Sequence, residues 1–326
     1  MLSLFPINKM NKRKDTIFAL ATPTGKSALA VIRISGNKSF NVVNQISSRM
    51  PKKSNVATLN KILNTKKEYI DQTITTKFKS PKSYTGEDMV ELSIHGGTAV
   101  INKIVKTINE FDHVRIAEPG EFTRRAFENS KLDLTQVEAI SDLINSETEA
   151  QRRQSINQLN GLFSDKIKKW SDKILKILSD IEAAIDFADE DLPGDLVITV
   201  KEQIENIYNE IKEYLKDNNI GEKIRSGFSI AILGKPNVGK STFINMIAKR
   251  DIAIVTDIPG TTRDTIELFT DFKGLPVKFY DTAGIRETSN TIESLGVEKS
   301  YKISTIADIN LVFIENEENI NNFSMI

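Results

Sequence analysis

The stretch 228–246, FSIAILGKPNVGKSTFINM, constrains the fold more than any other part of this sequence. An apolar, β-branched run leads into G-K-P-N-V-G-K-S at 234–241, and apolar residues then recur on one face of a helical pattern. This order predicts a strand, a phosphate-binding loop and a helix. In such a loop, successive backbone N–H groups cradle a phosphate at the positive end of the helix. We expect Lys240 to reach the β- and γ-phosphates and Ser241 to ligate Mg²⁺.

Composition limits the other kinds of site that this chain can build. Lysine and arginine together number 44, as do aspartate and glutamate, so net charge predicts no nucleic-acid or membrane partner, although a local basic patch remains compatible with it. The sequence has no cysteine, which excludes disulfides, thiolate zinc sites and cysteine nucleophiles, and two histidines are too few for a histidine-rich metal centre. We expect a cytoplasmic protein without a signal peptide or a membrane helix.

The first part of the chain predicts an α/β domain with a mixed sheet over residues 15–131, after a basic tail at residues 1–14. Strand-like and helical patterns alternate in it. Strands are expected at 16–22, 28–36, 70–78 and 89–95 and from Thr58 onward, and helices at 39–46 and 98–111. Two charged stretches, 81–88 and 119–131, are interpreted as polar loops that either only connect these elements or carry a site.

Residues 132–224 predict the first part of a helical domain, because apolar residues recur there in steps of three and four. Thr135 and Glu138 form a capping-box pattern, and the stripe over 156–185 predicts one long helix. Another helix is expected over 196–215, ended by Gly221. The acidic stretch 186–195 is either a metal site or a solvated turn between helices, and the lack of a recurring ligand spacing favours the turn.

Residues 225–326 predict a nucleotide-binding domain, in which strands and helices alternate again. The strand at 277–280 runs into D-T-A-G at 281–284, where Asp281 would hold Mg²⁺ through water and Gly284 would offer an N–H to a γ-phosphate. Between this motif and the loop, Thr262 is the expected second Mg²⁺ hydroxyl. A phosphate loop alone fits a GTPase, a kinase or an ATPase, but this order of motifs favours a switch-type GTPase.

Two details refine the expected mechanism. Ras-like proteins place a glutamine directly after D-x-x-G to orient the attacking water, whereas this chain has Ile285. A carboxylate in the following segment must therefore orient that water. The amide oxygen of Asn237 could bind a monovalent cation beside the phosphates, which would supply the charge that an arginine finger supplies elsewhere.

Three segments resemble Era-type GTPases: K-P-N-V-G-K-S at 235–241, I-V-T-D-I-P-G-T-T-R-D at 254–264 and D-T-A-G-I-R at 281–286. The upstream stretches Y-T-G-E-D, H-G-G, P-G-E-F-T-R-R-A-F and K-L-D-L-T-Q-V-E-A-I narrow the resemblance to the MnmE (also called TrmE) family of tRNA-modification GTPases. The resemblance extends over nearly the whole chain, from Asp15 to Ile314.

The resemblance implies an α/β and α multidomain fold with three parts: an N-terminal folate-binding and dimerising domain, a helical domain, and a P-loop GTPase domain inserted into the helical domain. It also implies a homodimer that works with the FAD protein MnmG to attach an aminomethyl-type group to C5 of the wobble uridine of tRNA. A tetrahydrofolate derivative, 5-formyl- or 5,10-methylene-tetrahydrofolate, would provide the one-carbon unit. K⁺-dependent dimerisation of the GTPase domains would drive GTP hydrolysis.

The same resemblance implies roles for individual residues. Arg33, Glu87 and Lys131 match folate-contacting positions. Ser241 and Thr262 match the Mg²⁺ ligands, and Glu293 matches the carboxylate that positions the water. The positions that match K⁺ ligands are Asn237, Thr256, Ile258 and Thr261. The full set matching GTP-binding positions is Asn237, Val238, Gly239, Lys240, Ser241, Thr242, Thr256, Asp257, Ile258, Pro259, Gly260, Thr261, Thr262, Asp281, Thr282, Ala283 and Gly284.

The sequence departs from the family pattern after Ile314, where it continues ENEENINNFSMI. No N-K-x-D segment for reading guanine follows, and neither do the later GTPase elements or the returning part of the helical domain. The chain is therefore interpreted as a truncated member with a partial GTPase domain. Two alternatives stay open at this point: a non-catalytic scaffold that dimerises and binds folate, and an Era-like regulatory GTPase that binds RNA.

Overall fold

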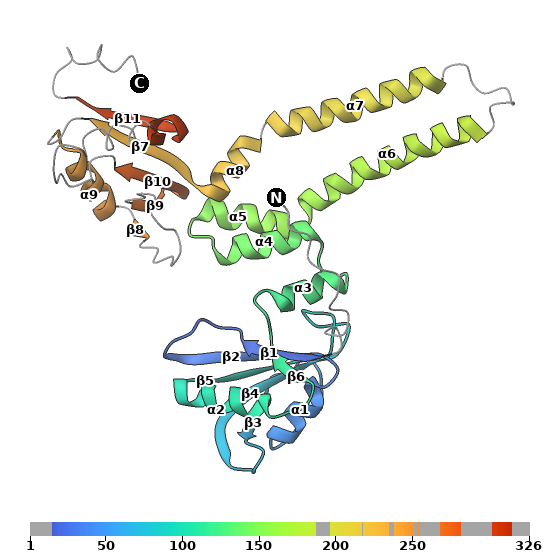
Figure 1. Cartoon of the computed structure of the whole chain (residues 1–326), viewed down its shortest axis with the longest axis vertical. Coiled ribbons are helices and arrows are strands. Elements are labelled where there is room, and N and C mark those ends of the chain that lie inside the picture. Colours follow the sequence, from blue (N-terminus) through green and yellow to red (C-terminus); the bar gives the residue numbers. More distant parts are fainter. Residues whose placement is uncertain are drawn as a thin grey trace. The chain divides into compact units, whose positions relative to one another are not determined.

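The computed structural model describes residues 15–186, 196–216, 218–234, 238–250, 253–254, 268–281 and 302–314 (Figure 1). The chain forms two compact units, one ending at Val137 and the other beginning at Glu138. The fold is of the expected α/β and α multidomain class. None of the helices within the described ranges combines the length and the hydropathy needed to cross a bilayer.

The first unit contains a mixed six-stranded sheet, as the alternating pattern predicts. Its strand order is β3-β4-β5-β2-β1-β6, and every neighbouring pair is antiparallel except β1 and β6, which run parallel. The strands are β1 (Thr16–Leu20), β2 (Ser27–Ser35), β3 (Thr58–Leu63), β4 (Tyr69–Phe78), β5 (Met89–Gly96) and β6 (Val114–Ile116).

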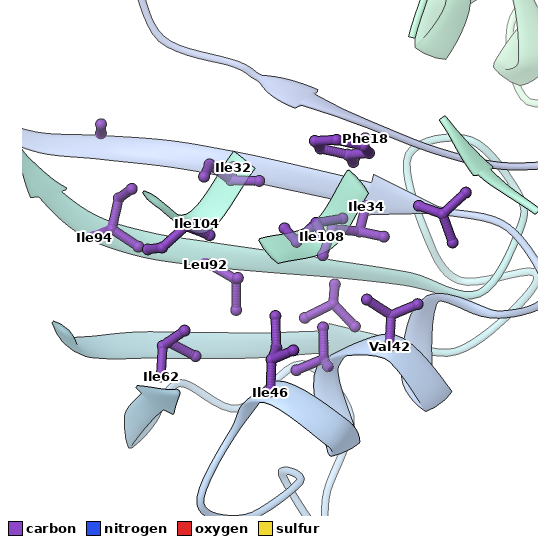
Figure 2. Close-up of a cluster of buried hydrophobic side chains, with 14 residues drawn as sticks. Phe18, Ile32, Ile34, Val42, Ile46, Ile62, Leu92, Ile94, Ile104 and Ile108 are labelled. Atoms are coloured by element: carbon purple, nitrogen blue, oxygen red, sulfur yellow. The ribbon is translucent and has the colours of Figure 1, made fainter. Parts of the chain in front are cut away.

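Two amphipathic helices, α1 (Ser39–Ile46) and α2 (Thr98–Asn109), pack on one face of this sheet. Figure 2 shows Val42 and Ile46 of α1 and Ile104 and Ile108 of α2 meeting the apolar side chains of the strands. Successive strand residues point to opposite faces, so alternate residues of β2 enter this core and Arg33 and Ser35 point to the other face. The candidate ligand-binding side chains of β2 are thereby kept out of the apolar core.

The segment 119–131 is not a loop throughout, as its polarity suggested, because it contains helix α3 (Glu121–Glu128). The helix follows Gly120, whose φ of 73° is more favourable for glycine than for residues with a side chain. Glu121 and Arg125 are four residues apart and pair at 3.1 Å along the helix. The polar composition of the segment suggested a loop, but the four-residue spacing of its opposite charges is that of a helix.

Helix α4 (Leu134–Ile144) begins with a different cap from the predicted one. Asp133 Oδ1 accepts hydrogen bonds from the backbone N–H of Gln136 at 2.9 Å and from the Thr135 hydroxyl at 2.8 Å. Gln136 Oε1 in turn accepts the backbone N–H of Asp133 at 3.0 Å. The reciprocal cap therefore joins Asp133 to Gln136, and the assignment to Thr135 and Glu138 was wrong by two residues.

The long helix predicted over 156–185 is two helices, α5 (Glu149–Leu159) and α6 (Leu162–Asp186). They are separated at Gly161, where a φ of +88° stops the right-handed helical conformation. Gly221, expected to end a helix, lies inside α8 (Asn218–Ser226), which follows α7 (Leu196–Lys216). Trp170, Ile177 and Ile207 form the buried contact between α6 and α7.

The second unit also contains a five-stranded sheet, of order β11-β7-β10-β9-β8. Strand β7 lies parallel to both β10 and β11, and helix α9 buries Ile244 and Ile247 against Ile232 and Phe279 of the sheet. Its elements are β7 (Phe228–Gly234), α9 (Lys240–Arg250), β8 (Ala253–Ile254), β9 (Leu268–Phe272), β10 (Leu275–Asp281) and β11 (Ile309–Phe313). The sequence pattern over 293–306 predicts a helix, and the described part of that range, 302–306, is helical.

Candidate functional site

The phosphate loop follows β7 and leads directly into α9. Gly234 ends the strand with a φ of 140°, and Lys240 is the first residue of the helix. The ammonium of Lys240 reaches back across the loop and donates to the carbonyl of Gly234 at 2.5 Å, and only 3% of the residue is exposed. Among the described residues, Gly239, with a φ of 98°, has no atom within 4 Å of the place where a Cβ would stand. This backbone suits the close approach of a phosphate at a helix N-terminus.

Asp281 ends β10 at the same edge of the sheet. Because β10 runs parallel to β7, with Asp281 in register with Ile232, the carboxyl ends of both strands lie together. Ligands of open parallel sheets bind outside these ends. Ser241 and Thr242 occupy the exposed first turn of α9, so the described part of the loop, Val238 to Thr242, and Asp281 converge on one edge.

All the remaining nucleotide and ion positions predicted from the sequence lie outside the described residues. They are Asn237, Thr256, Asp257, Ile258, Pro259, Gly260, Thr261, Thr262, Thr282, Ala283, Gly284 and Glu293. The same applies to most of the acidic stretch 186–195. Among the residues that are described, no cluster of three or more histidine, aspartate or glutamate side chains could hold a metal ion.

A second group of candidate residues lies in the first unit, around the loop before β5. Arg33 of β2 donates from Nε to Glu91 of β5 at 2.8 Å. Its guanidinium also lies 5.0 Å from the ring centroid of Tyr84 and 5.5 Å from that of Phe122. Contacts of a cation with two aromatic faces at such distances are attractive, so they fix this guanidinium at the point where β2, the loop and α3 meet.

Glu87 is anchored to both β2 and α3. Its Oε2 accepts the hydroxyl of Ser35 at 2.7 Å and Nη1 of Arg125 at 3.0 Å. The Ser35 hydroxyl is also 2.7 Å from the hydroxyl of Thr85, within the same loop. The carboxylate is therefore held in one orientation by neutral and charged donors together.

Arg125 lies between two carboxylates. It pairs with Glu87 and, at 3.1 Å, with Glu121, which is only 2% exposed and also binds Arg115 at 2.7 Å. Burial acts to raise the pKa of Glu121. The hydrogen bonds from Arg115 and from the backbone of Glu118, with the charges of Arg115 and Arg125, outweigh burial and lower that pKa to about 2. Glu121 is thus an ionised anchor for the two arginines that flank it.

Lys131, the third predicted folate residue, lies against the same loop. Its backbone N–H donates to Ala126 at 2.8 Å, and its Cγ lies 3.2 Å from the place where a Cβ on Gly86 would stand. The neighbouring Asn129 donates from its side chain to the carbonyl of Thr85 at 2.7 Å. The structure thus brings Arg33, Glu87 and Lys131 around the segment 84–87.

Several residues of this group were missed by sequence reasoning. Tyr84, Phe122 and Arg125 lie within the motifs Y-T-G-E-D and P-G-E-F-T-R-R-A-F that carry the resemblance, yet none of the three was assigned a role of its own. The four-residue spacing of Glu121 and Arg125 was an available signal for the helix. Nothing local indicates that Arg125 pairs with a residue 38 positions earlier. The arrangement offers cations, aromatic faces and a fixed carboxylate, which suit a flat, hydrogen-bonding ring that carries anionic groups.

A phosphate loop between a parallel strand and a helix, beside a second parallel strand that ends in aspartate, defines a P-loop nucleotide-binding domain. The family described as "GTP-binding protein TrmE N-terminus" matches residues 16–131, and the family described as "MnmE helical domain" matches residues 134–322.

Curated relatives agree with these matches. A protein of Roseobacter denitrificans is 44% identical over 297 residues, which are 90% of this chain and 69% of the relative. One from Anaplasma marginale is 44% identical over 306 residues, which are 94% of this chain and 68% of the relative. One from Pelagibacter ubique is 45% identical over 302 residues, which are 92% and 68%. Each is named tRNA modification GTPase MnmE. The chain belongs to the MnmE (TrmE) family of tRNA modification GTPases.

Proposed function

We propose that this chain is the GTP-hydrolysing subunit of a system that modifies C5 of the wobble uridine of tRNA, in the cytoplasm. The main support for the proposal is the phosphate loop. Its buried Lys240 and the first turn of α9 lie at the same edge of the sheet as Asp281. A lysine at this position contacts β- and γ-phosphate oxygens in P-loop enzymes, and the serine after it binds the nucleotide's Mg²⁺. The relatives' shared name supports the link to tRNA.

In this proposal, Lys240 binds phosphate oxygens, while Ser241 and Thr262 hold Mg²⁺. Asn237, Thr256, Ile258 and Thr261 hold a K⁺ ion whose charge stabilises the transition state. Glu293 orients the attacking water, since Ile285 has no polar group to do so. Hydrolysis depends on K⁺ because two GTPase domains pair around the ion in a homodimer, which acts together with an MnmG-type FAD protein.

The N-terminal unit binds a tetrahydrofolate derivative, which supplies the one-carbon unit when bound. Glu87 accepts hydrogen bonds from the amino-pyrimidine edge of the pterin, because the two oxygens of a carboxylate can each accept from one of two adjacent N–H groups. Arg33, held against Tyr84 and Phe122, and Lys131 bind the anionic or carbonyl groups of the ligand. Arg125 positions Glu87 and does not itself reach the ligand, since its side chain is only 7% exposed.

Single-turnover GTP hydrolysis in K⁺ and in Na⁺ tests the nucleotide half of the proposal. A rate that rises in K⁺ is expected. GTP binding without any effect of K⁺ would contradict the K⁺ site, and no GTP binding at all would favour the non-catalytic scaffold.

Calorimetric binding of 5-formyl-tetrahydrofolate tests the folate half. Glu87→Ala should weaken this binding at least about tenfold, because a charged hydrogen bond contributes about 1.5–3 kcal/mol. GTP hydrolysis by this variant should be unchanged. Asp112→Ala removes an exposed carboxylate of the same unit and serves as the matched control. An unchanged folate affinity in Glu87→Ala would remove Glu87 from the site.

A further inference from the structure

The neutral total charge of the chain conceals a strong internal asymmetry. Residues 15–137 carry 18 lysines and arginines against 12 aspartates and glutamates, while residues 138–326 carry 22 against 32. Within the first unit the excess comes from one segment, because residues 37–86 carry ten basic side chains against two acidic ones. The remainder of that unit, with eight basic and ten acidic residues, is close to balance.

These cations gather along one edge of the unit. The segment comprises α1, the loop after it, the edge strand β3, β4 and the start of the next loop, and β3 pairs only with β4 in the order of the sheet (Figure 1). Lys77 Nζ donates to the carbonyl of Lys52 at 3.3 Å, and the carbonyl of Lys61 accepts the backbone N–H of Ser48 at 2.9 Å, next to Arg49. Lys67 Nζ donates to the carbonyl of Gln45 on α1 at 2.8 Å. These contacts join the elements around this edge of the sheet, with Lys77 on the face that carries α1, over the ring of Phe40, and Lys61 on the opposite face.

The surface retains most of its positive charge. Among the described residues, no carboxylate lies within ion-pair distance of Arg49, Lys52, Lys61, Lys66 or Lys67, whereas Lys79 pairs with Asp88 at 2.8 Å. Two acidic side chains, Glu68 and Glu110, lie close to it and accept hydrogen bonds from neutral groups, so the cations of the surface outnumber them. Glu68 accepts from the side chain of Asn64 at 2.6 Å, and Glu110 accepts from Thr65 at 2.8 Å.

Exposed polar side chains are interspersed among these cations. They are Asn41, Gln45, Ser48, Asn55 and Thr65. Hydroxyl and amide side chains of this kind, together with lysine and arginine, are the groups that bind phosphate and sugar oxygens of nucleic acids. The same segment also exposes Val56, Leu59, Tyr69 and Ile74, so an anionic membrane is the competing occupant, and binding to vesicles is measured beside binding to RNA.

We propose that this α1–β3 basic surface, formed by Arg49, Lys52, Lys53, Lys61, Lys66, Lys67 and Lys77, binds the phosphate backbone of RNA. The identification of that RNA as tRNA rests on the proposed function. The contact is electrostatic and independent of base sequence, so it orients the nucleic acid and does not select it. It is separate from the residues assigned to folate and to the nucleotide.

The test replaces Lys52, Lys61 and Lys66 together by glutamine in the full chain. All three are exposed, and within the described part of the chain none of their side chains donates a hydrogen bond that the fold would lose. Binding of a fluorescent tRNA transcript is followed by anisotropy while salt is raised from about 50 to about 200 mM, the range in which phosphate contacts dominate the affinity. Lys168, Lys169 and Lys201→Gln, three exposed lysines of the second unit, form the charge-matched control.

The variant is expected to bind tRNA at least about tenfold more weakly. The slope of log affinity against log salt concentration should become shallower by about two to three, which is close to one for each lost phosphate contact. The control should keep both values. Equal loss in variant and control, or no loss in either, would overturn the proposal. So would unchanged tRNA binding with reduced binding to phosphatidylcholine vesicles containing phosphatidylserine. GTP binding by the parent chain is measured in parallel. If the parent chain binds tRNA through this surface but binds no GTP, the proposed GTPase function is refuted and the proposed RNA-binding surface is still supported.

Discussion

Arg125 and Glu87 join helix α3 to the loop before β5, with Nη1 of the arginine 3.0 Å from Oε2 of the glutamate. The same guanidinium holds Glu121 at 3.1 Å. One arginine therefore fixes both an anchoring carboxylate and the carboxylate that we assign to the ligand. The position of Glu87 depends on a side chain that no ligand needs to touch.

Replacing Arg125 by glutamine should lower the free energy of unfolding by about 3 kcal/mol, because it leaves two carboxylates, one of them buried, without their shared cation. Urea denaturation followed by circular dichroism measures this change. Arg124→Gln removes the neighbouring, half-exposed arginine and should cost no more than about 1 kcal/mol. Similar decreases in the free energy of unfolding of the two variants would show that the buried ion pairs of Arg125 do not stabilise the fold more than the exposed ones of Arg124.

The stability of the first unit should depend on acid through Glu121. Its pKa in the folded chain is about 2, compared with an ordinary value of 4.5, so its contribution is fully present above pH 4.5 and is lost as the pH falls towards 2. The contribution is about 3 kcal/mol. Glu121→Gln should therefore be less stable than the parent at neutral pH, and the two denaturation midpoints should converge as the pH approaches 2. Parallel curves over this range would count against the assignment.

Gly234→Ala should destabilise the sheet that carries the phosphate loop and weaken GTP binding. A Cβ there would stand 2.5 Å from the carbonyl oxygen of Phe313 on β11, and the φ of 140° is unfavourable for any side chain. We expect a loss of about 1–3 kcal/mol in thermal or urea unfolding. Gly274 also has a positive φ, of 89°, but no atom of the described residues lies within 4 Å of the place where its Cβ would stand, so Gly274→Ala isolates the backbone cost from the clash. The Gly234 variant should be the less stable of the two.

Glu293→Ala should leave the affinity for GTP unchanged and slow single-turnover hydrolysis at least about a hundredfold, the usual scale for removing a group that positions or activates the reacting water. Filter binding and quenched-flow measurements separate these two effects. Glu298→Ala, five residues further on, is the control and should behave as the parent. Loss of GTP binding in the Glu293 variant would contradict a purely catalytic role.

Much of the fold follows from local patterns in the sequence. Alternating apolar residues predicted β4 and β5 closely, and helical spacing predicted α1 and α2, because each element has one face in the same core. The phosphate loop was predictable from glycine spacing alone. The errors occur where a single backbone conformation decides the outcome: Gly161 interrupts an apolar stripe that continues on both sides, whereas Gly221 is accommodated within α8.

The candidate sites divide in the same way. The roles of Lys240 and Ser241 are set by their immediate neighbours, so a motif is enough to suggest them. The group around Glu87 depends on contacts between distant segments: Ser35 is 52 residues from Glu87, and Arg125 is 38 residues from it. The basic surface was hidden for a different reason, since a net charge summed over the whole chain cancels opposite contributions from its two units.

One hydrogen bond in the second unit connects the helical region to the nucleotide-binding sheet. The backbone N–H of Ala150, in the first turn of α5, donates to the carbonyl of Gly274 in the turn between β9 and β10 at 3.1 Å. N–H groups in a first helical turn have no partner within their own helix. Exchange of this amide proton with deuterium from solvent therefore requires the turn to leave α5. Strand β10 begins beside that turn and ends at Asp281. The exchange rate of the Ala150 amide therefore reports whether the sheet stays packed on α5 while nucleotide binds and is released.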